Sequence, residues 1–328
     1  MLARGILLLG AMMLSQTGSA QAPGPPLALE TKIPLGEVSG RIDHLGIDPK
    51  RQRLFVAELG NNSLGVINVA AAKILRRISG LSEPQGVAYV PSVDNVYVTN
   101  GGDGSVRVFS GDDLAPLARI ALGDDADNVR VDGQRNRVLV GYGKGALAVI
   151  DPTTRSKVAD IRLKAHPEGF QIEETDGRVF VNLPDARQIE IVDLGSQQHR
   201  SLPTDALRSN FPMAIDAGAH RVLVVFRSPP TLAAFANPDG SVVARAATCG
   251  DADDVFVDAK RRRVYVSCGD GVVDVFEQTE AGYRRLAQIP TVSGARTSLF
   301  VPGLDRLFVA ARAGSGEPAA IWVFRPVP

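Results

Sequence analysis

The sequence has no excess of charge of either sign: Lys and Arg together number 36, and Asp and Glu together number 36, among 328 residues. Proteins that bind nucleic acid neutralise phosphates with a basic surface, and many stack bases on aromatic side chains. Aromatic residues make up only 5% of this chain. The composition therefore argues against nucleic acid as a partner and against a basic surface for anionic membranes.

Long apolar runs are nearly absent. The run Gly5–Leu14 follows Arg4 and is too short to span a bilayer, which takes about 18 residues or more. A positive residue, a short apolar run and small residues before Ala20 or Ala22 are typical of a cleaved signal peptide. The sequence therefore predicts a signal peptide over residues 1–22 and a periplasmic or secreted mature chain over residues 23–328, without a membrane span.

Motifs of familiar catalytic sites are missing as well. The chain has no Gly-x-Ser-x-Gly nucleophile elbow, no His-Glu-x-x-His zinc motif and no glycine-rich dinucleotide fingerprint. Function must therefore be sought in side chains that are distant in sequence and that the fold brings together.

Short apolar runs separated by turn residues are what the sequence has in quantity. Between Glu83 and Gly123, four such runs follow one another, namely Val87–Val90, Val96–Asn100, Ser105–Phe109 and Leu117–Leu122. Their length and β-branched content are typical of strands, and no run has a helical period. Four strands in about 42 residues is the size of one β-propeller blade.

The same unit recurs along the chain at nearly constant spacing. Each copy has a first run, a turn and a second run that begins nine residues after the start of the first. The paired runs are Leu45–Asp48 with Leu54–Ala57, Val87–Val90 with Val96–Thr99, Val129–Asp132 with Val138–Val140, Phe170–Glu173 with Val179–Asn182, Met213–Asp216 with Val222–Val225, Val255–Asp258 with Val264–Ser267, and Ser298–Pro302 with Leu307–Ala310. The repeats predict an all-β, seven-bladed β-propeller of four-stranded blades.

The two ends of the repeat region indicate how the ring closes. The last unit stops after its third run, Ile321–Phe324, and lacks a fourth. Leu27–Leu35, ahead of the first unit, resembles the fourth run Arg285–Pro290 of the sixth unit. We therefore expect the N-terminal strand to complete the last blade, which removes an exposed sheet edge.

Val96-Tyr97-Val98-Thr99-Asn100 spells the pentapeptide of the YVTN-repeat β-propellers. The chain resembles that family over essentially all of the predicted mature part, and Val264–Cys268 and Leu54–Glu58 are relaxed copies. The resemblance implies an exported seven-bladed propeller, and it identifies a blade rather than a reaction. WD40, Kelch and quinoprotein propellers are less similar, because the chain has one Trp and no repeated Trp motif.

Candidate functional residues come from the segments that lead into the first strands, because in a propeller these segments lie at the mouth of the central channel. The residues two positions before the seven first strands are Asp43, Gln85, Asp127, Glu168, Phe211, Asp253 and Arg296. Two neighbouring columns include His44, Asn128 and Asp254, and Asp125, His166 and Asp251. The predicted ligand-binding residues are Asp43, Gln85, Asp127, Asn128, Glu168, Asp253 and Arg296, together with Arg227 from a turn that opens on the same face.

The chemistry of these residues permits more than one interpretation. Carboxylates beside the candidate catalytic residues His44 and His166 suit general acid–base catalysis. Oxygen ligands also suit Ca²⁺ or another divalent cation. The candidate metal ligands are Asp43, Asp127, Glu168 and Asp253.

A third interpretation is a solvated mouth whose charges neutralise one another. Arg41 and Arg296 would then pair with two of the aspartates. Asp127 and Glu168 would remain as the carboxylates without a cation, because crowded carboxylates cannot all stay ionised. We expect these two to contact a cation, or a cationic or polyhydroxyl ligand.

Cysteine is scarce, with only Cys249 and Cys268 in the chain. Both fall in the sixth unit, one before its leading segment and the other at the end of its second strand. Because the first strand runs away from the mouth and the second returns, both cysteines are expected at the same end of the blade. In an oxidising compartment this placement predicts a disulfide.

Two functions are compatible with these patterns. The first is an exported binding or interaction propeller, expected to be a monomer, that holds a small molecule, a metal or a protein partner at the channel mouth. The second is a divalent-metal-dependent lactonase or related hydrolase. Lactonase and gluconolactonase propellers also gather Glu, Asn and Asp on their axis, and the chain is loosely similar to them in this respect.

Overall fold

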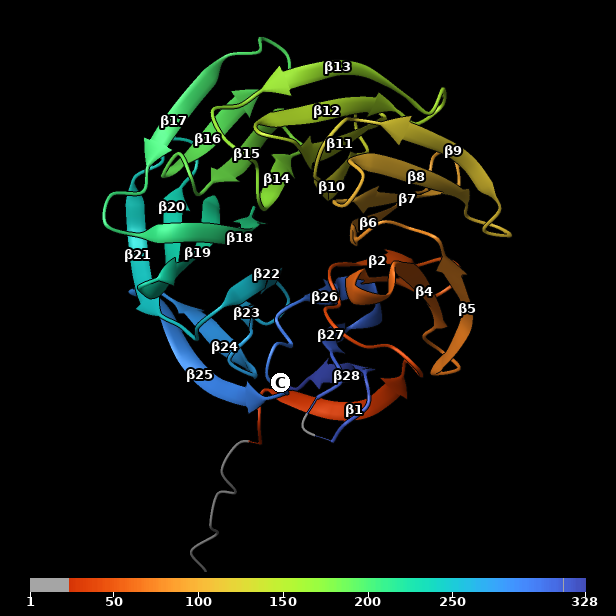
Figure 1. Ribbon diagram of the computed structural model, residues 1–328. Coiled ribbons are helices and arrows are strands. Elements are labelled where there is room, and N and C mark those ends of the chain that lie inside the picture. The colour runs from red at the N-terminus through yellow and green to blue at the C-terminus, as the bar shows by residue number, and fades with distance from the viewer. Residues whose placement is uncertain (1–23, 315) are drawn as a thin grey trace, which may run out of the picture.

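The computed structural model describes residues 24–314 and 316–328, so the predicted signal peptide lies outside the described part of the chain. Within it, seven four-stranded antiparallel sheets are arranged around a ring, as Figure 1 shows. The all-β, seven-bladed β-propeller predicted from the repeats is confirmed.

Each of the first six blades takes four consecutive strands, ordered from the channel outward. The first three blades are β2 (Leu45–Asp48), β3 (Arg53–Glu58), β4 (Ser63–Asn68) and β5 (Lys73–Ser79); β6 (Pro84–Val90), β7 (Asn95–Asn100), β8 (Ser105–Ser110) and β9 (Pro116–Ala121); and β10 (Ala126–Asp132), β11 (Arg137–Tyr142), β12 (Ala146–Asp151) and β13 (Ser156–Arg162). The next three are β14 (Phe170–Glu173), β15 (Arg178–Leu183), β16 (Gln188–Asp193) and β17 (His199–Pro203); β18 (Arg208–Asp216), β19 (Arg221–Ser228), β20 (Pro230–Ala236) and β21 (Val242–Ala247); and β22 (Ala252–Asp258), β23 (Arg263–Cys268), β24 (Val272–Thr279) and β25 (Gly282–Pro290).

The seventh blade is built from both ends of the chain. It contains β26 (Ser298–Val301), β27 (Arg306–Ala311) and β28 (Ala320–Pro326), and β1 (Leu27–Pro34) forms its outer strand. β1 pairs antiparallel with β28 from Leu27 opposite Pro326 to Pro34 opposite Ala320. The predicted closure by the N-terminal strand is therefore confirmed.

Apolar side chains fill the spaces between neighbouring blades. Every hydrophobic cluster of the described residues draws its members from two adjacent blades, and together the clusters run around the whole ring. Ile33 of β1, for example, packs in one cluster with Leu54 of the first blade and Ile321 of the seventh. A blade buries both of its faces only when it has a neighbour on each side, so the core depends on a closed ring.

Ion pairs also connect neighbouring blades, at the end of the first strands away from the mouth. Arg51 donates to Asp48 of its own blade at 2.9 Å and to Asp94 of the second blade at 2.7 Å. Arg261 makes the same pair of contacts, at 2.9 Å to Asp258 and at 2.7 Å to Asp305 of the seventh blade. In these two blades, the Asp-x-x-Arg sequence connects one blade to the next.

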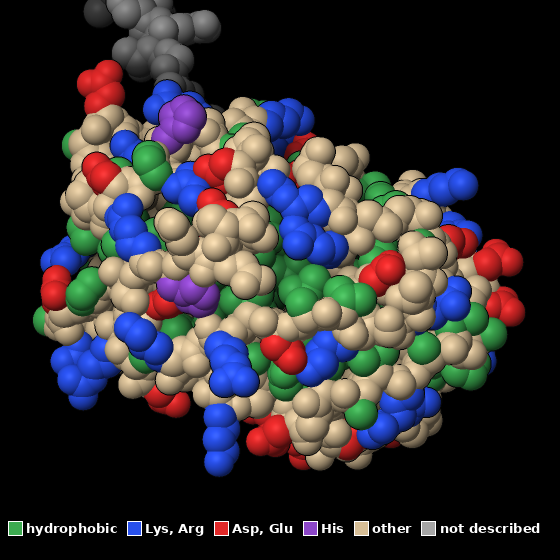
Figure 2. All heavy atoms as spheres, turned by 90° about the horizontal axis from the view of Figure 1, so that it is seen from above, with side chains coloured by type: hydrophobic (Ala, Val, Ile, Leu, Met, Phe, Trp, Pro, Cys, Tyr) green, Lys and Arg blue, Asp and Glu red, His purple; other side chains and the backbone are tan. Residues whose placement is uncertain are grey.

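The outer surface does not concentrate charge of one sign on the side shown in Figure 2, where acidic and basic side chains are interspersed. Among the helices of the described residues, none is long and apolar enough to cross a membrane. These findings agree with the balanced composition of the chain.

Ring closure gives a first testable prediction. Ile33→Ala empties a fully buried position between the last and first blades, so we expect the free energy of unfolding to fall by about 2–5 kcal/mol. Leu29→Ala changes the same strand at a side chain that is 45% exposed and should cost no more than about 0.5 kcal/mol. Denaturant unfolding of the two variants measures the difference. Equal effects would contradict the role of β1 in sealing the ring.

Candidate functional site

A cavity of about 810 Å³ occupies the central channel. Its walls are the first strands of all seven blades and the segments that lead into them. Most sequence-predicted candidates line this cavity, namely His44, Gln85, Asp127, Asn128, His166, Glu168, Arg227, Asp253 and Arg296. Asp43 lies behind the lining and is only 1% exposed.

The pentapeptide Val96–Asn100 helps to shape the mouth. All of its side chains are buried in β7. The Gly86 N–H donates to the Thr99 hydroxyl oxygen at 2.7 Å, and that hydroxyl donates to the carbonyl oxygen of Asp127. Thr99 thus connects the leading segments of the second and third blades.

The equivalent position has the same role in two other second strands, β15 and β23. Asn182 of β15 donates through Nδ2 to the carbonyl oxygen of Phe211 at 2.9 Å, in the leading part of the fifth blade. The hydroxyls of Ser267 and Ser298 lie 2.7 Å apart and connect the sixth blade to the seventh. In these three blades, a polar residue at this position connects one mouth segment to the next.

Two arginines bracket the acidic segment of the sixth blade. Arg227 Nη2 donates to Asp253 Oδ1 at 2.6 Å, and its guanidinium lies 3.8 Å from the centre of the Phe211 ring. Arg296 Nε is 2.9 Å from Asp253 Oδ2, and Nη1 is 2.9 Å from Asp251 Oδ2. Burial raises the pKa of Asp253, while both guanidiniums oppose the rise. This side of the mouth is a fixed network of paired charges.

The first blade adds a second paired group. Arg41 Nη2 lies 3.0 Å from Asp43 Oδ2, and burial raises the pKa of Asp43 to about 6. Nδ1 of His44 is 3.4 Å from Asp254 Oδ2. Burial alone would lower the pKa of His44, but Asp254 and Asp43 outweigh burial and raise it to about 10. His44 is thus held as a cation at neutral pH, which is unsuited to a general base.

His166 is surrounded by acceptors at the mouth of the third and fourth blades. Its Nδ1 lies 2.6 Å from the carbonyl oxygen of Gly143 and 3.8 Å from Asp125 Oδ2. Nε2 is 3.9 Å from Asp127 Oδ2. Burial favours the neutral ring, but Asp127 and the Gly143 carbonyl outweigh it and raise the pKa of His166 to about 9.

Glu168 differs from the other mouth carboxyls because, within the described part of the chain, it forms an ion pair with neither an arginine nor a histidine. Burial and the nearby charge of Asp127 raise its pKa to about 8, although His166 acts in the opposite direction. Near neutral pH the Glu168 carboxyl is therefore mostly protonated and offers a hydrogen-bond donor to the cavity.

The four candidate metal ligands do not come together as a site. Nowhere in residues 24–314 and 316–328 are three or more His, Cys, Asp or Glu side chains grouped so that they could hold a metal ion. Asp43 and Asp253 face guanidinium groups, and Glu168 favours its neutral form. The arrangement therefore does not fit a resident Ca²⁺ or other divalent cation, which prefers several charged oxygens around it.

Sequence reasoning missed two polar residues that line the cavity below the mouth, Arg130 of β10 and Gln171 of β14. Both occupy the second position of the first run in their blades. The other five blades have small or apolar residues there, namely Gly46, Ala88, Ala214, Phe256 and Leu299. Two polar residues in a column whose other members are small or apolar were the signal that could have identified them.

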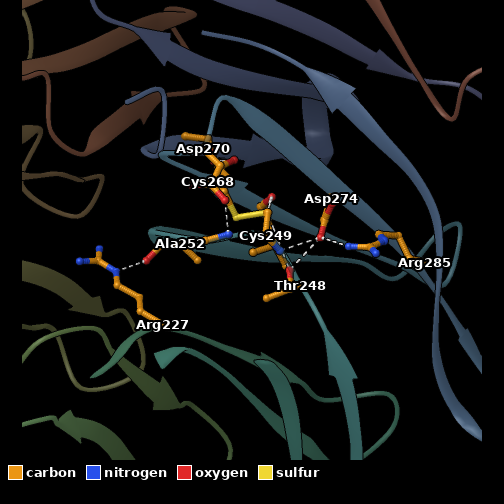
Figure 3. Close-up of a disulfide and its surroundings, with 12 residues drawn as sticks. Arg227, Thr248, Cys249, Ala252, Cys268, Asp270, Asp274 and Arg285 are labelled. Carbon is orange, nitrogen blue, oxygen red and sulfur yellow. Dashed lines mark hydrogen bonds and ion pairs between the residues drawn. A yellow bond between two sulfur atoms is a disulfide. The ribbon is translucent and has the colours of Figure 1, made fainter. Parts of the chain in front are cut away.

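The predicted disulfide between Cys249 and Cys268 is confirmed and anchors the acidic segment (Figure 3). Asp274 accepts hydrogen bonds from the backbone N–H of Cys249 at 2.9 Å and from Arg285 at 3.0 Å. On the mouth side, Arg227 donates to the carbonyl oxygen of Ala252 at 2.8 Å. The chain between Cys249 and Ala252 is therefore held at both ends, just before Asp253.

Comparison with known proteins identifies the fold but no family. No protein-family model matches the chain, and no curated protein does. Its fold is similar to a chain of Kuenenia stuttgartiensis hydrazine synthase, at 16% identity and a TM-score of 0.73 over 84% of this chain and 94% of that one. A chain of a mitotic checkpoint complex aligns at 13% identity and a TM-score of 0.77, covering 98% and 99% of the two chains. The RRP9 WD40 repeats align at 11% identity and a TM-score of 0.76, covering 90% and 96%. Identities this low establish the shared propeller fold alone, and the three proteins differ in function.

The disulfide gives the second testable prediction. Closing a loop with a sequence separation of 19 should contribute about 3 kcal/mol to stability through the lost freedom of the unfolded chain. A reductant should therefore lower the melting temperature of the native protein. The Cys249→Ala/Cys268→Ala double variant is the control, since its melting temperature should not respond to reductant. Two free thiols in the unreduced, denatured native protein would contradict the bond.

The third prediction concerns the ionisation of Glu168. Its pKa is about 8 in the folded protein and 4.5 in a model peptide, so between these values the folded state binds the proton more tightly. The free energy of unfolding should therefore fall as the pH rises from about 4.5 to 8, by a few kcal/mol at most. Glu168→Gln cannot ionise, so relative to the native protein it should be more stable at pH 8 than at pH 5.

Unfolding measurements at the two pH values test this expectation. Glu174→Gln, at an exposed position of the same blade, is the control and should leave the native pH dependence unchanged. Parallel pH profiles for Glu168→Gln and the native protein would contradict the assignment.

Proposed function

We propose that this protein is an exported propeller that binds a small ligand at the mouth of its central channel. Asp127 and Glu168 are the first contacts, and Asn128 and His166 lie beside them. The observation that carries the proposal is the cavity of about 810 Å³, which lies in the range of about 300–1,000 Å³ typical of small-molecule sites.

The two contact carboxyls offer complementary hydrogen-bonding chemistry. Asp127 presents an acceptor, and Asn128 Nδ2 lies 3.3 Å from its Oδ2. Glu168, with its raised pKa, supplies a donor near neutral pH. A donor beside an acceptor suits a hydroxyl-bearing or cationic group on the ligand. The arginine-paired carboxylates across the mouth are already neutralised and are less available for this role.

Export and family membership are part of the proposal. The apolar run within residues 1–22 and the disulfide both support an oxidising compartment, periplasmic or extracellular. The pentapeptide Val96–Asn100 supports membership of the YVTN-repeat propellers, and its Thr99 helps to position Asp127. In this interpretation the pentapeptide forms a strand of its blade and also positions a ligand-binding residue at the channel mouth.

Hydrolysis is a second candidate function, favoured by the raised pKa of Glu168. A protonated carboxyl can give its proton to a leaving oxygen, as in a general acid of a lactonase or related hydrolase. The metal-dependent form of this alternative is not favoured, because the candidate ligands do not converge. Lactone turnover by the native protein that Glu168→Gln abolishes, while Glu174→Gln retains it, would support this alternative over simple binding.

The fourth prediction tests binding at the mouth. Small polyols and small cationic amines are screened by thermal shift with the mature chain, and at about ten times its Kd a ligand should add about 1.4 kcal/mol of stability. Asp127→Asn/Glu168→Gln should abolish the shift caused by any such probe. The control is Asp205→Asn/Glu280→Gln, which removes the same groups from exposed positions. Equal shifts in the native protein and the mouth variant would contradict the proposal, as would the absence of any shift.

A further inference from the structure

Arg130 occupies an unusual position among the arginines of the cavity. The lining contains Arg41, Arg130, Arg227 and Arg296. Three of them have a carboxylate oxygen 3.2 Å away or closer. For Arg130, the described residues provide no such partner, and its one hydrogen bond goes to the carbonyl oxygen of Val129 at 2.9 Å. Its guanidinium carbon also lies 5.5 Å from the centre of the Phe170 ring, and its other N–H groups make no hydrogen bond with the described residues.

None of the acidic residues of the mouth forms an ion pair with Arg130 among the described residues, and most of them have another cation nearby. Asp125 and Asp127 face His166, and Asp254 faces His44, all at 3.9 Å or less. Asp43, Asp251 and Asp253 are paired with arginines, and Glu168 is mostly neutral at pH 7. Burial lowers the pKa of Arg130, and the more distant charges of Asp254 and Asp127 oppose this lowering only in part.

The position of Arg130 below the mouth indicates how a ligand would reach it. Arg130 follows Asp127 by three residues on β10, which places it at most about 10 Å further along the channel at the rise of a strand. Gln171, on the neighbouring blade, lines the same wall, and its amide is fixed by a hydrogen bond to the carbonyl oxygen of Met213 at 2.9 Å. This wall is polar and cationic.

The facing wall is apolar. Phe256 of β22 and Leu299 of β26 line the cavity, both only partly buried, and Figure 1 places these strands across the ring from β10 and β14. Ala88 and Ala214, on the blades between them, leave the channel open at this level. The channel below the mouth is therefore cationic on one wall and apolar on the other.

We propose that this part of the channel is a subsite for an organic anion that has an apolar body. The carboxylate or phosphate of the ligand pairs with the guanidinium of Arg130, whose planar donors match two oxygens at once. The apolar body packs against Phe256 and Leu299, and any polar head faces Asp127 and Glu168. The inference rests on the proposed function, since it assigns a ligand class to the same cavity.

The fifth prediction uses three small-molecule probes, each with six carbon atoms: the anions hexanoate and hexyl phosphate, and the neutral hexanol. Calorimetric titration of the disulfide-bonded mature protein should detect at least one of the anions at probe concentrations up to about 10 mM. Arg130→Gln should weaken that binding at least tenfold and leave hexanol unaffected. The two anions distinguish a carboxylate ligand from a phosphate ligand.

Control variants separate the effect of the Arg130 charge on binding from general effects of substitution on the protein. Arg162→Gln removes an exposed arginine from β13 of the same blade and should not change any affinity. Phe256→Ala should weaken all three probes to a similar degree, because it removes the apolar contact. If Arg130→Gln does not fold, the native protein still tests the inference. Added NaCl should weaken the binding of the two anions and leave the binding of hexanol unchanged.

Three results would overturn the inference: no anion binds, Arg130→Gln binds the anions as the native protein does, or salt affects all probes alike. Failure of the proposed function is distinguishable from these. If hexanol or a mouth probe binds and the anions do not, the cavity is a ligand site without an anion subsite. If no probe of either set binds, both proposals fail.

Discussion

The burial of both faces of every blade is the constraint on which this structure depends. Each hydrophobic cluster lies between two blades, so no blade can bury its apolar side chains alone. The ring must close, and it closes by pairing β1 with β28 across the two ends of the chain. Ile33 completes the joint, since it packs with side chains of the first and last blades. The cavity exists because seven blades packed in this way leave space around their common axis.

Polar residues of three second strands connect neighbouring blades at the channel mouth. Thr99, Asn182 and Ser267 occupy equivalent positions on second strands, and each reaches the leading part of the next blade. A side chain at this position therefore contributes to the fold of one blade and to the mouth geometry of its neighbour. The disulfide adds a covalent restraint where the mouth is most acidic, directly before Asp253. The mouth is rigid because the scaffold holds its backbone.

Charge is distributed unevenly around this rigid mouth. Arginines and His44 pair with the mouth carboxylates of the first and sixth blades, whereas the mouth carboxylates of the third and fourth blades have no arginine partner among the described residues. There, burial and crowding keep Glu168 protonated and His166 charged near neutral pH. One level below, Arg130 has no acidic partner among the described residues. The channel thus offers a donor, an acceptor and a free cation along one wall, facing apolar side chains.

The sequence by itself determined the number of blades, the strands of each repeat, the closing strand and the pairing of Cys249 with Cys268, because these follow from periodicity and from where strands begin and end. It also identified the residues of the mouth, since one position per repeat leads into each first strand. Only the tertiary structure decided how their charges pair: that Arg227 joins Arg296 at Asp253, and that Asp43 is buried behind the lining. The ion pairs of Asp253 join different blades. Their distances depend on the direction and burial of side chains, which cannot be read from the spacing of the repeats. The sequence places Arg130 in a column of mostly small or apolar residues, but only the tertiary structure shows that it has no carboxylate partner among the described residues.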